Sequence, residues 1–206
     1  MIGDTTLRAE LFADPHSFST AEATVTHLEW DAKVDFEAQE IHATAVWTLS
    51  ELHGDQIVFD TKALEIKEVL LDGQEAHWSF GKEDDLLGSA LVVYDLSPAS
   101  KQVAITYTTT EGAEAVQWFP AELTQGGRMP FLFTQGQAML ARTWIPCQDR
   151  PGVRFTYSAK VQVPEGMLAL MSASNPTQKS ATGRYEFTMP QPIPSYLMAL
   201  GAGDLE

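Results

Sequence analysis

The residue types that could recognise a ligand are concentrated in one segment, from Phe131 to Val153, with the sequence FLFTQGQAMLARTWIPCQDRPGV. Its most informative feature is a pair of glutamines, Gln135 and Gln137, which lie two positions apart and are followed by the small residue Ala138. A primary amide offers both a donor and an acceptor without the desolvation cost of a full charge, and this suits recognition of a polar ligand. Spacing alone, however, favours a structural role in which both glutamines satisfy backbone groups at the end of a strand.

The chain contains no complete set of catalytic residues. There is no H-E-x-x-H zinc motif. The five histidines are His16, His27, His42, His53 and His77, and none of them lies three or four residues from another. We therefore expect no metal site. There is also no G-x-S-x-G motif, and Cys147 has no histidine near it in sequence. The simplest interpretation of Cys147 is a small buried apolar residue.

Composition limits the partners of the chain. With 13 basic and 28 acidic residues the formal net charge is −15, which repels nucleic-acid phosphates and anionic membranes, so neither is an expected partner. The single cysteine favours a reducing compartment. Residues 1–18 contain early acids and lack the continuous apolar stretch that a signal peptide or a membrane span requires. We therefore expect a cytoplasmic protein.

The elements that must position the glutamines are β-strands. Apolar residues alternate with polar ones in two neighbouring segments, around Leu28–Phe36 and Ile41–Leu49, and this pattern predicts an antiparallel hairpin. Asp72 and Gly73 predict a tight turn. Further strands are expected at residues 56–60, 63–71, 75–80, 90–96, 102–109, 153–163, 168–173, 185–189 and 196–201.

The region after Gly112 loses this alternation, and the stretch to Pro130 is the longest loop that we expect. No window has a helical apolar stripe of useful length, and residues 137–143 could form two turns at most. We therefore predict a single all-β domain over residues 1–206, of packed, twisted antiparallel sheets with at most one short helix, because one open sheet of about twelve strands would leave faces and edges uncovered.

The segment from Phe131 to Tyr157 resembles the amino-terminal domain of the zinc aminopeptidases, peptidase family M1, in the branch that includes the leukotriene hydrolases. The resemblance rests on FLFTQGQAMLAR and on IPCQDRPGVRFTY, with support from residues 26–28, 168–173 and 191–197. It implies a saddle-shaped β-domain that lies over a thermolysin-like catalytic domain. The zinc helix and the exopeptidase motif G-x-M-E-N of that family would then lie beyond Glu206.

The resemblance also implies roles for individual residues. Gln137 matches the position that helps to hold the free α-amine and backbone of the substrate, and Gln135 matches one that lines the pocket for the first side chain. Ala138 matches a position where a small side chain leaves room for substrate. For Asp149 we expect a structural role, in capping backbone donors or fixing the turn before Pro151, and Arg142 could pair with an acid. Trp118, Phe119, Phe131 and Phe133 are expected in the core or at a domain interface.

The implied function is that of a substrate-cleft domain in an enzyme that removes amino-terminal residues from peptides, with zinc and the general base supplied by the catalytic domain. The chain by itself is expected to be inactive. A different class of function, a self-sufficient β-sandwich that binds peptide or carbohydrate, remains open, as does a scaffold that only stabilises its neighbour. The cleft hypothesis expects an exposed apolar docking patch from the later half of the chain.

Overall fold

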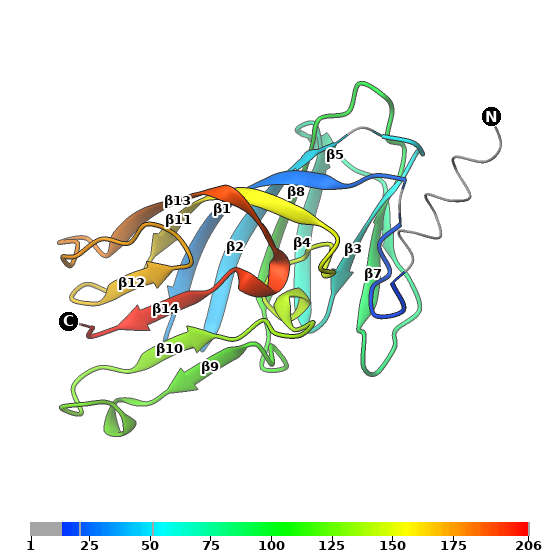
Figure 1. The fold of residues 1–206 in the computed structure, drawn as a ribbon. Helices are drawn as coiled ribbons and strands as arrows, with labels where there is room; N and C mark the ends of the chain where they lie inside the picture. Colours follow the sequence, from blue (N-terminus) through cyan, green and yellow to red (C-terminus); the bar gives the residue numbers. More distant parts are fainter. Residues whose placement is uncertain (1–13, 21, 51, 206) are drawn as a thin grey trace.

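The computed structural model describes residues 14–20, 22–50 and 52–205, which form fourteen β-strands and three short 3₁₀ helices. The strands belong to three sheets, of seven, four and three strands (Figure 1). The prediction of an all-β fold is confirmed. The 3₁₀ helices are single turns, at η1 (Ala121–Leu123), η2 (Ala141–Thr143) and η3 (Ser195–Leu197).

The seven-stranded sheet has the order β13-β11-β1-β2-β8-β4-β5. In that order its strands are Arg184–Pro194, Arg154–Gln162, Val25–Asp35, Glu40–Leu49, Gln102–Thr109, Leu64–Leu71 and Gln74–Glu75. Neighbouring strands are antiparallel except for β1 and β11, which run parallel. A parallel pair needs a long connection, and here the connecting chain passes through both smaller sheets.

The four-stranded sheet lies beside the large sheet and has the order β12-β14-β10-β9 (Figure 1). Its strands are Leu168–Met171, Leu200–Gly203, Phe131–Thr134 and Val116–Phe119. The three-stranded sheet, at the right in Figure 1, has the order β3-β7-β6. Its strands are Ile57–Thr61, Ser89–Val93 and Trp78–Phe80.

The predicted hairpin is present as β1 and β2. On each strand, the residues expected to share a face are buried, and their neighbours are mostly exposed or half-buried, as a period of two residues requires. The buried residues are Leu28, Trp30, Ala32 and Val34 on β1, and Ile41, Ala43, Ala45, Trp47 and Leu49 on β2. The predicted turn is present as well. Asp72 and Gly73 connect β4 to β5 with φ values of 50° and 80°, the positive values that a type I′ hairpin turn needs.

Four parts of the strand prediction are wrong. β10, over Phe131–Thr134, lies outside every strand that we expected. β9 forms inside the expected long loop, where the short run VQWF pairs with β10. The strand expected over residues 75–80 is divided between two sheets, as β5 and β6. The strand expected over residues 196–201 begins instead with η3 and becomes β14 only at Leu200. In each case the partner strand decides the outcome, and local sequence does not identify the partner.

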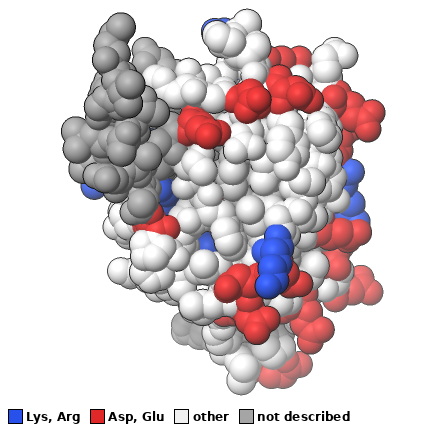
Figure 2. Space-filling view, turned by 90° about the vertical axis from the view of Figure 1, so that its right-hand side faces the viewer, with Lys and Arg blue, Asp and Glu red and all other residues white. Residues whose placement is uncertain are grey.

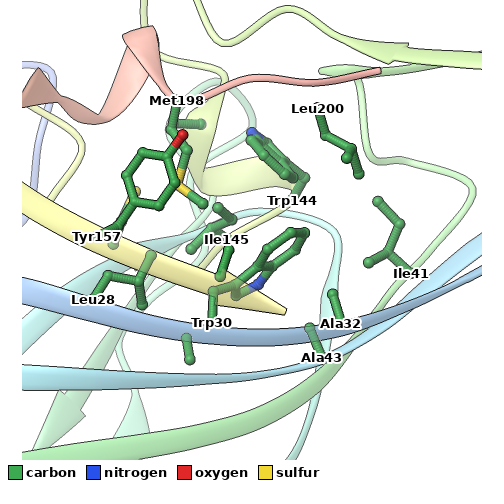
Figure 3. Packing of buried hydrophobic residues seen from close by; sticks show 14 of the residues in the cluster. Leu28, Trp30, Ala32, Ile41, Ala43, Trp144, Ile145, Tyr157, Met198 and Leu200 are labelled. Carbon is green, nitrogen blue, oxygen red and sulfur yellow. The ribbon is translucent and has the colours of Figure 1, made fainter. Parts of the chain in front are cut away.

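The core between the large sheet and the four-stranded sheet is built around tryptophans (Figure 3). Trp30 points from β1 toward Trp144, and the two rings meet edge to face with centroids 5.4 Å apart. The Trp30 Nε1 donates to the Tyr107 hydroxyl at 2.9 Å, and that hydroxyl donates to the Trp144 carbonyl at 2.9 Å. The Trp47 Nε1 donates to the Pro146 carbonyl at 2.9 Å. The large sheet thus holds the segment after η2 by buried hydrogen bonds.

The surface reflects the acidic composition. On the face that Figure 2 shows, acidic side chains outnumber basic ones and gather mainly toward the edges of a broad area of uncharged residues. No helix in the described part of the chain is long and apolar enough to cross a membrane.

Candidate functional site

Residues 135–138, which we call the glutamine tip, follow directly after β10. Gln135, Gln137 and Ala138 are exposed, whereas Gly136 between them is buried. The Gln135 N–H donates to the Ala115 carbonyl at 2.8 Å, which continues the pairing of β10 with the segment before β9. The peptide bond between Gln137 and Ala138 is cis. The structure thus brings the three sequence-predicted residues together at one exposed turn.

The two glutamines differ in their hydrogen bonding. The Gln135 side-chain oxygen accepts from the Gln137 N–H at 3.1 Å, so this amide is partly occupied by the turn itself. The Gln137 side chain has no hydrogen bond to any other described residue. Of the two alternatives for these residues, the geometry supports the structural one for Gln135 in part, and it leaves the Gln137 amide available to a ligand.

The segment that follows the tip is buried, in contrast to the exposed tip. All residues from Ala141 to Arg150, which we call the buried run, are buried. Cys147 joins the run to β3 by a two-way bridge with the backbone of Asp60. The Thr143 hydroxyl accepts from the Ala115 N–H at 3.0 Å and donates to the Leu140 carbonyl at 2.8 Å. An exposed turn is therefore attached to a segment that cannot shift without disturbing the core.

Arg142 and Asp149 form a buried ion pair within this run. Arg142 Nε lies 3.1 Å from Asp149 Oδ2, and both side chains are 1% exposed. The same oxygen accepts from the backbone N–H of Arg142 at 3.2 Å. The expectations that Arg142 pairs with an acid and that Asp149 caps a backbone donor are both confirmed. The Arg142 guanidinium also donates to the carbonyls of His16, Leu87 and Asp149, so each of its three nitrogens has a hydrogen-bond partner.

A second buried carboxylate, Asp60, was missed by the sequence analysis. It is completely buried at the end of β3 and accepts from the Ser17 hydroxyl at 2.6 Å, the Phe18 N–H at 2.6 Å and the Asp149 N–H at 2.8 Å. Burial raises the pKa of the Asp60 carboxyl, although the nearby Arg142 charge opposes that effect. The only sequence signal was an acid that ends an otherwise apolar strand.

A groove of about 640 Å³ lies beside β9 and β10. Three half-buried rings on these strands form one side of it, with centroids 5.7 Å apart for Phe119 and Phe133 and 6.0 Å apart for Phe131 and Phe133. Arg128 and Asp204 at its rim form an ion pair at 2.8 Å, and Lys179 also pairs with Asp204. Trp118, by contrast, packs edge to face on Phe36. All residues that line the groove come from the later part of the chain, between Phe119 and Leu205.

The described residues do not supply a metal site. No group of three or more His, Cys, Asp or Glu side chains in ranges 14–20, 22–50 and 52–205 is placed to hold a metal ion. His27 and His42 sit on neighbouring strands but at different registers, and each ring lies near a threonine hydroxyl instead. Cys147 is 1% exposed, and burial raises the pKa of its thiol, so the reactive thiolate is disfavoured.

Comparison with known proteins identifies the family of the chain. The sequence profile of the Peptidase M1 N-terminal domain matches residues 24–197. The chain is 36% identical over 206 aligned positions to leukotriene A-4 hydrolase of Xenopus laevis, covering 94% of this chain and 34% of that protein. It is 35% identical over 178 positions to leucine aminopeptidase 2 of Yarrowia lipolytica, covering 84% of this chain and 27% of that protein. The chain thus spans about a third of the length of these relatives.

Solved structures give the same result for the fold. The yeast leukotriene A4 hydrolase, solved in complex with bestatin, superimposes with a TM-score of 0.86 at 31% identity, over 94% of this chain and 31% of that one. An M1 zinc metallopeptidase from Deinococcus radiodurans, at 19% identity, shares the fold with a TM-score of 0.68, over 90% of this chain and 43% of that one. With the profile match over most of its length, the chain belongs to peptidase family M1, as a member of its amino-terminal domain family.

Proposed function

We propose that residues 1–206 are the amino-terminal domain of a larger zinc aminopeptidase, and that this domain forms one wall of the substrate cleft. In this proposal Gln135, Gln137 and Ala138 face the amino-terminal end of a peptide substrate. The observation that carries the proposal is the Gln137 amide, which is exposed and unpaired on a tip attached to the buried run. Membership of family M1 supplies the class of substrate.

The chemistry of Gln137 fits this role. Its amide oxygen can accept from a protonated α-amine, and its amide nitrogen can donate to a backbone carbonyl of the same peptide. Holding both groups in one orientation removes part of the entropy cost of reaching the transition state. Ala138 beside it presents only a methyl group, which leaves space for the ligand.

The metal would belong to another part of the protein. The Deinococcus radiodurans structure is that of a zinc metallopeptidase, and we propose the same metal for the protein of which this chain is a part. The described residues contain no set of ligands that fits zinc. The contribution of this chain is therefore limited to binding and orienting the peptide, and no step at the metal is assigned to its residues.

The groove beside β9 and β10 supports the proposed partner. Its half-buried phenylalanines and the exposed Leu123, at 71% exposure, form an apolar surface of the kind that a domain interface covers. We propose that the catalytic domain of the same chain covers this groove. Such an arrangement would place the catalytic domain next to the glutamine tip, because Phe133, on β10, precedes Gln135 by only two residues.

The test is a kinetic comparison in a protein that joins this chain to its catalytic domain. We expect Gln137→Ala to lower kcat/KM for aminoacyl anilides roughly tenfold or more, the effect of losing one hydrogen bond to a charged group. Zinc content should remain unchanged. Gln117→Ala is the matched control, since Gln117 is also an exposed glutamine but its amide nitrogen donates to the nearby Glu114 carbonyl. Equal turnover by the Gln137→Ala variant and the parent protein would show that the assigned role is wrong.

A further inference from the structure

One carboxylate, Asp149, holds the glutamine tip from two directions. On the chain that follows the tip, its Oδ2 binds the backbone N–H and the Nε of Arg142. On the opposite side, its Oδ1 accepts from the Ser195 hydroxyl at 2.6 Å. Asp149 and Ser195 are 3% and 2% exposed, so these hydrogen bonds are shielded from water. Charge-assisted hydrogen bonds in such surroundings are among the strongest that proteins form.

Ser195 matters because its neighbour touches the tip. A Cβ placed on Gly136 would lie 3.1 Å from the Cα of Tyr196 and 3.2 Å from its carbonyl oxygen. The backbone of η3 therefore packs directly on the backbone of the tip, at the residue between the two glutamines. The position of Ser195 fixes the position of Tyr196, and that contact limits where Gly136 can lie.

Arg142 is connected to the tip by backbone hydrogen bonds in the short segment between them. The Leu140 N–H donates to the Gly136 carbonyl at 2.8 Å, and the Thr143 N–H donates to the Leu140 carbonyl at 3.0 Å. These bonds connect the tip to η2, where Arg142 is anchored by Asp149. The two routes, through η2 and through η3, both end at Gly136.

We propose that Asp149 is a positioning residue for the glutamine tip, acting through Arg142 on one side and through Ser195 on the other. Its role is to set the direction of the Gln137 amide, which it does not touch. The consequence for peptide binding rests on the proposed function, whereas the effect on the geometry of the tip can be measured without it.

The experiment uses the isotopically labelled 206-residue chain and its Ser195→Ala variant. The readout is the NMR resonances of the Gly136 amide and of the side-chain amides of Gln135 and Gln137, assigned with glutamine-to-alanine variants. We expect all three groups to shift or broaden in Ser195→Ala. The matched control is Ser100→Ala, which removes another buried hydroxyl, the acceptor of the Ser97 N–H at 3.1 Å, in a loop with no contact to the tip.

Both serine variants should lower the urea midpoint of unfolding, so loss of stability alone does not distinguish them. If the tip resonances move in Ser195→Ala and stay unchanged in Ser100→Ala, the positioning role is supported. If they are the same in Ser195→Ala as in the parent chain, or if they move equally in Ser100→Ala, the proposal is overturned.

Asp149→Asn provides a second, stronger perturbation, since it removes the charge and keeps only one of the two oxygens that now accept from Arg142 and from Ser195. In a protein with a catalytic domain, Ser195→Ala should lower kcat/KM for aminoacyl anilides by less than Gln137→Ala does, with zinc content unchanged. Movement of the tip resonances together with unchanged activity of Gln137→Ala would contradict the proposed function and leave the positioning role intact. Unmoved tip resonances together with an inactive Gln137→Ala variant would contradict the positioning role and leave the proposed function intact.

Discussion

In our proposal, three buried residues determine the geometry of the exposed glutamine tip. Asp60, Arg142 and Asp149 are all buried, and together they connect β3, the buried run and residues 16–18. A buried pair of charges is rarely a strong source of net stability, because desolvation offsets the attraction. Its value lies in the hydrogen bonds that a carboxylate can accept in fixed directions, and these orient an exposed turn that has few contacts of its own.

Asp60 makes the stability of the chain depend on pH in an uncommon direction. Because its pKa is raised above the ordinary value of 3.8, the folded state keeps this proton at pH values where the unfolded state has lost it. Its contribution to the free energy of unfolding is therefore full at low pH and is lost as the pH rises through the folded pKa. In Asp60→Asn this loss cannot occur.

We therefore expect the free energy of unfolding of Asp60→Asn, relative to that of the parent chain, to increase as the pH rises from about 4 toward neutrality, which means that the variant becomes relatively more stable. Urea unfolding of both proteins over a pH series measures this difference. The other carboxyl groups are present in both proteins, so their effect on the pH dependence cancels in the comparison. A difference that is constant with pH, or that changes in the opposite direction, would contradict a raised pKa for Asp60.

At the level of elements, the strands that could be predicted are those whose pattern is set by burial of one face. The β1–β2 hairpin follows from the alternation of residues such as Trp30 and Trp47, because side chains on a strand alternate between core and solvent. β9 escaped prediction because four residues are too few to show a period, and its identity depends on pairing with β10. The same limit applied to β14, whose glycines, Gly201 and Gly203, carry no strand signal.

The sequence predicted the exposed residues of the site, but it did not predict how the buried residues hold them in place. The glutamines are contiguous in sequence, so their proximity needed no folding information. Asp149, which we propose positions the tip, is itself bound through its N–H by Asp60, and the meeting of these two residues depends on the pairing of β3 with the buried run around Cys147. Nothing local in the sequence identifies such a long-range pairing.

Tyr107 on β8 connects the large sheet to the buried run, and this connection can be tested. Tyr107→Phe would leave the Trp30 Nε1 and the Trp144 carbonyl without their present partner, since the hydroxyl accepts from one and donates to the other. We expect a loss of about 2 to 4 kcal/mol in the free energy of unfolding, because a buried polar group without a partner costs ~1–3 kcal/mol.

Tyr94→Phe is the matched control for this change. The Tyr94 hydroxyl also has a hydrogen-bond partner, the Ser79 hydroxyl at 3.0 Å, but it lies in a half-buried position where water can replace that partner. We expect a loss below about 1 kcal/mol. Equal losses in the two variants, measured by urea unfolding, would show that Tyr107 does not anchor the buried run to the sheet.

On the scale of the whole molecule, the chain presents an exposed glutamine tip and an apolar groove beside the strand that precedes it, and we propose that together they form one half of a binding site. Its fold has the amino-terminal domain of the M1 peptidases as its counterpart, and its length is about a third of that of related enzymes. An exposed, unpaired amide suits a site that a second domain completes.

The most direct test of this account compares the purified 206-residue chain with a longer protein that adds the catalytic domain. Hydrolysis of an aminoacyl anilide and bound zinc, measured by elemental analysis, are recorded for both proteins. We expect turnover and about one zinc per molecule only in the longer protein, as for a catalytic site with one metal ion. Stoichiometric zinc or peptide turnover in the 206-residue chain by itself would contradict the account.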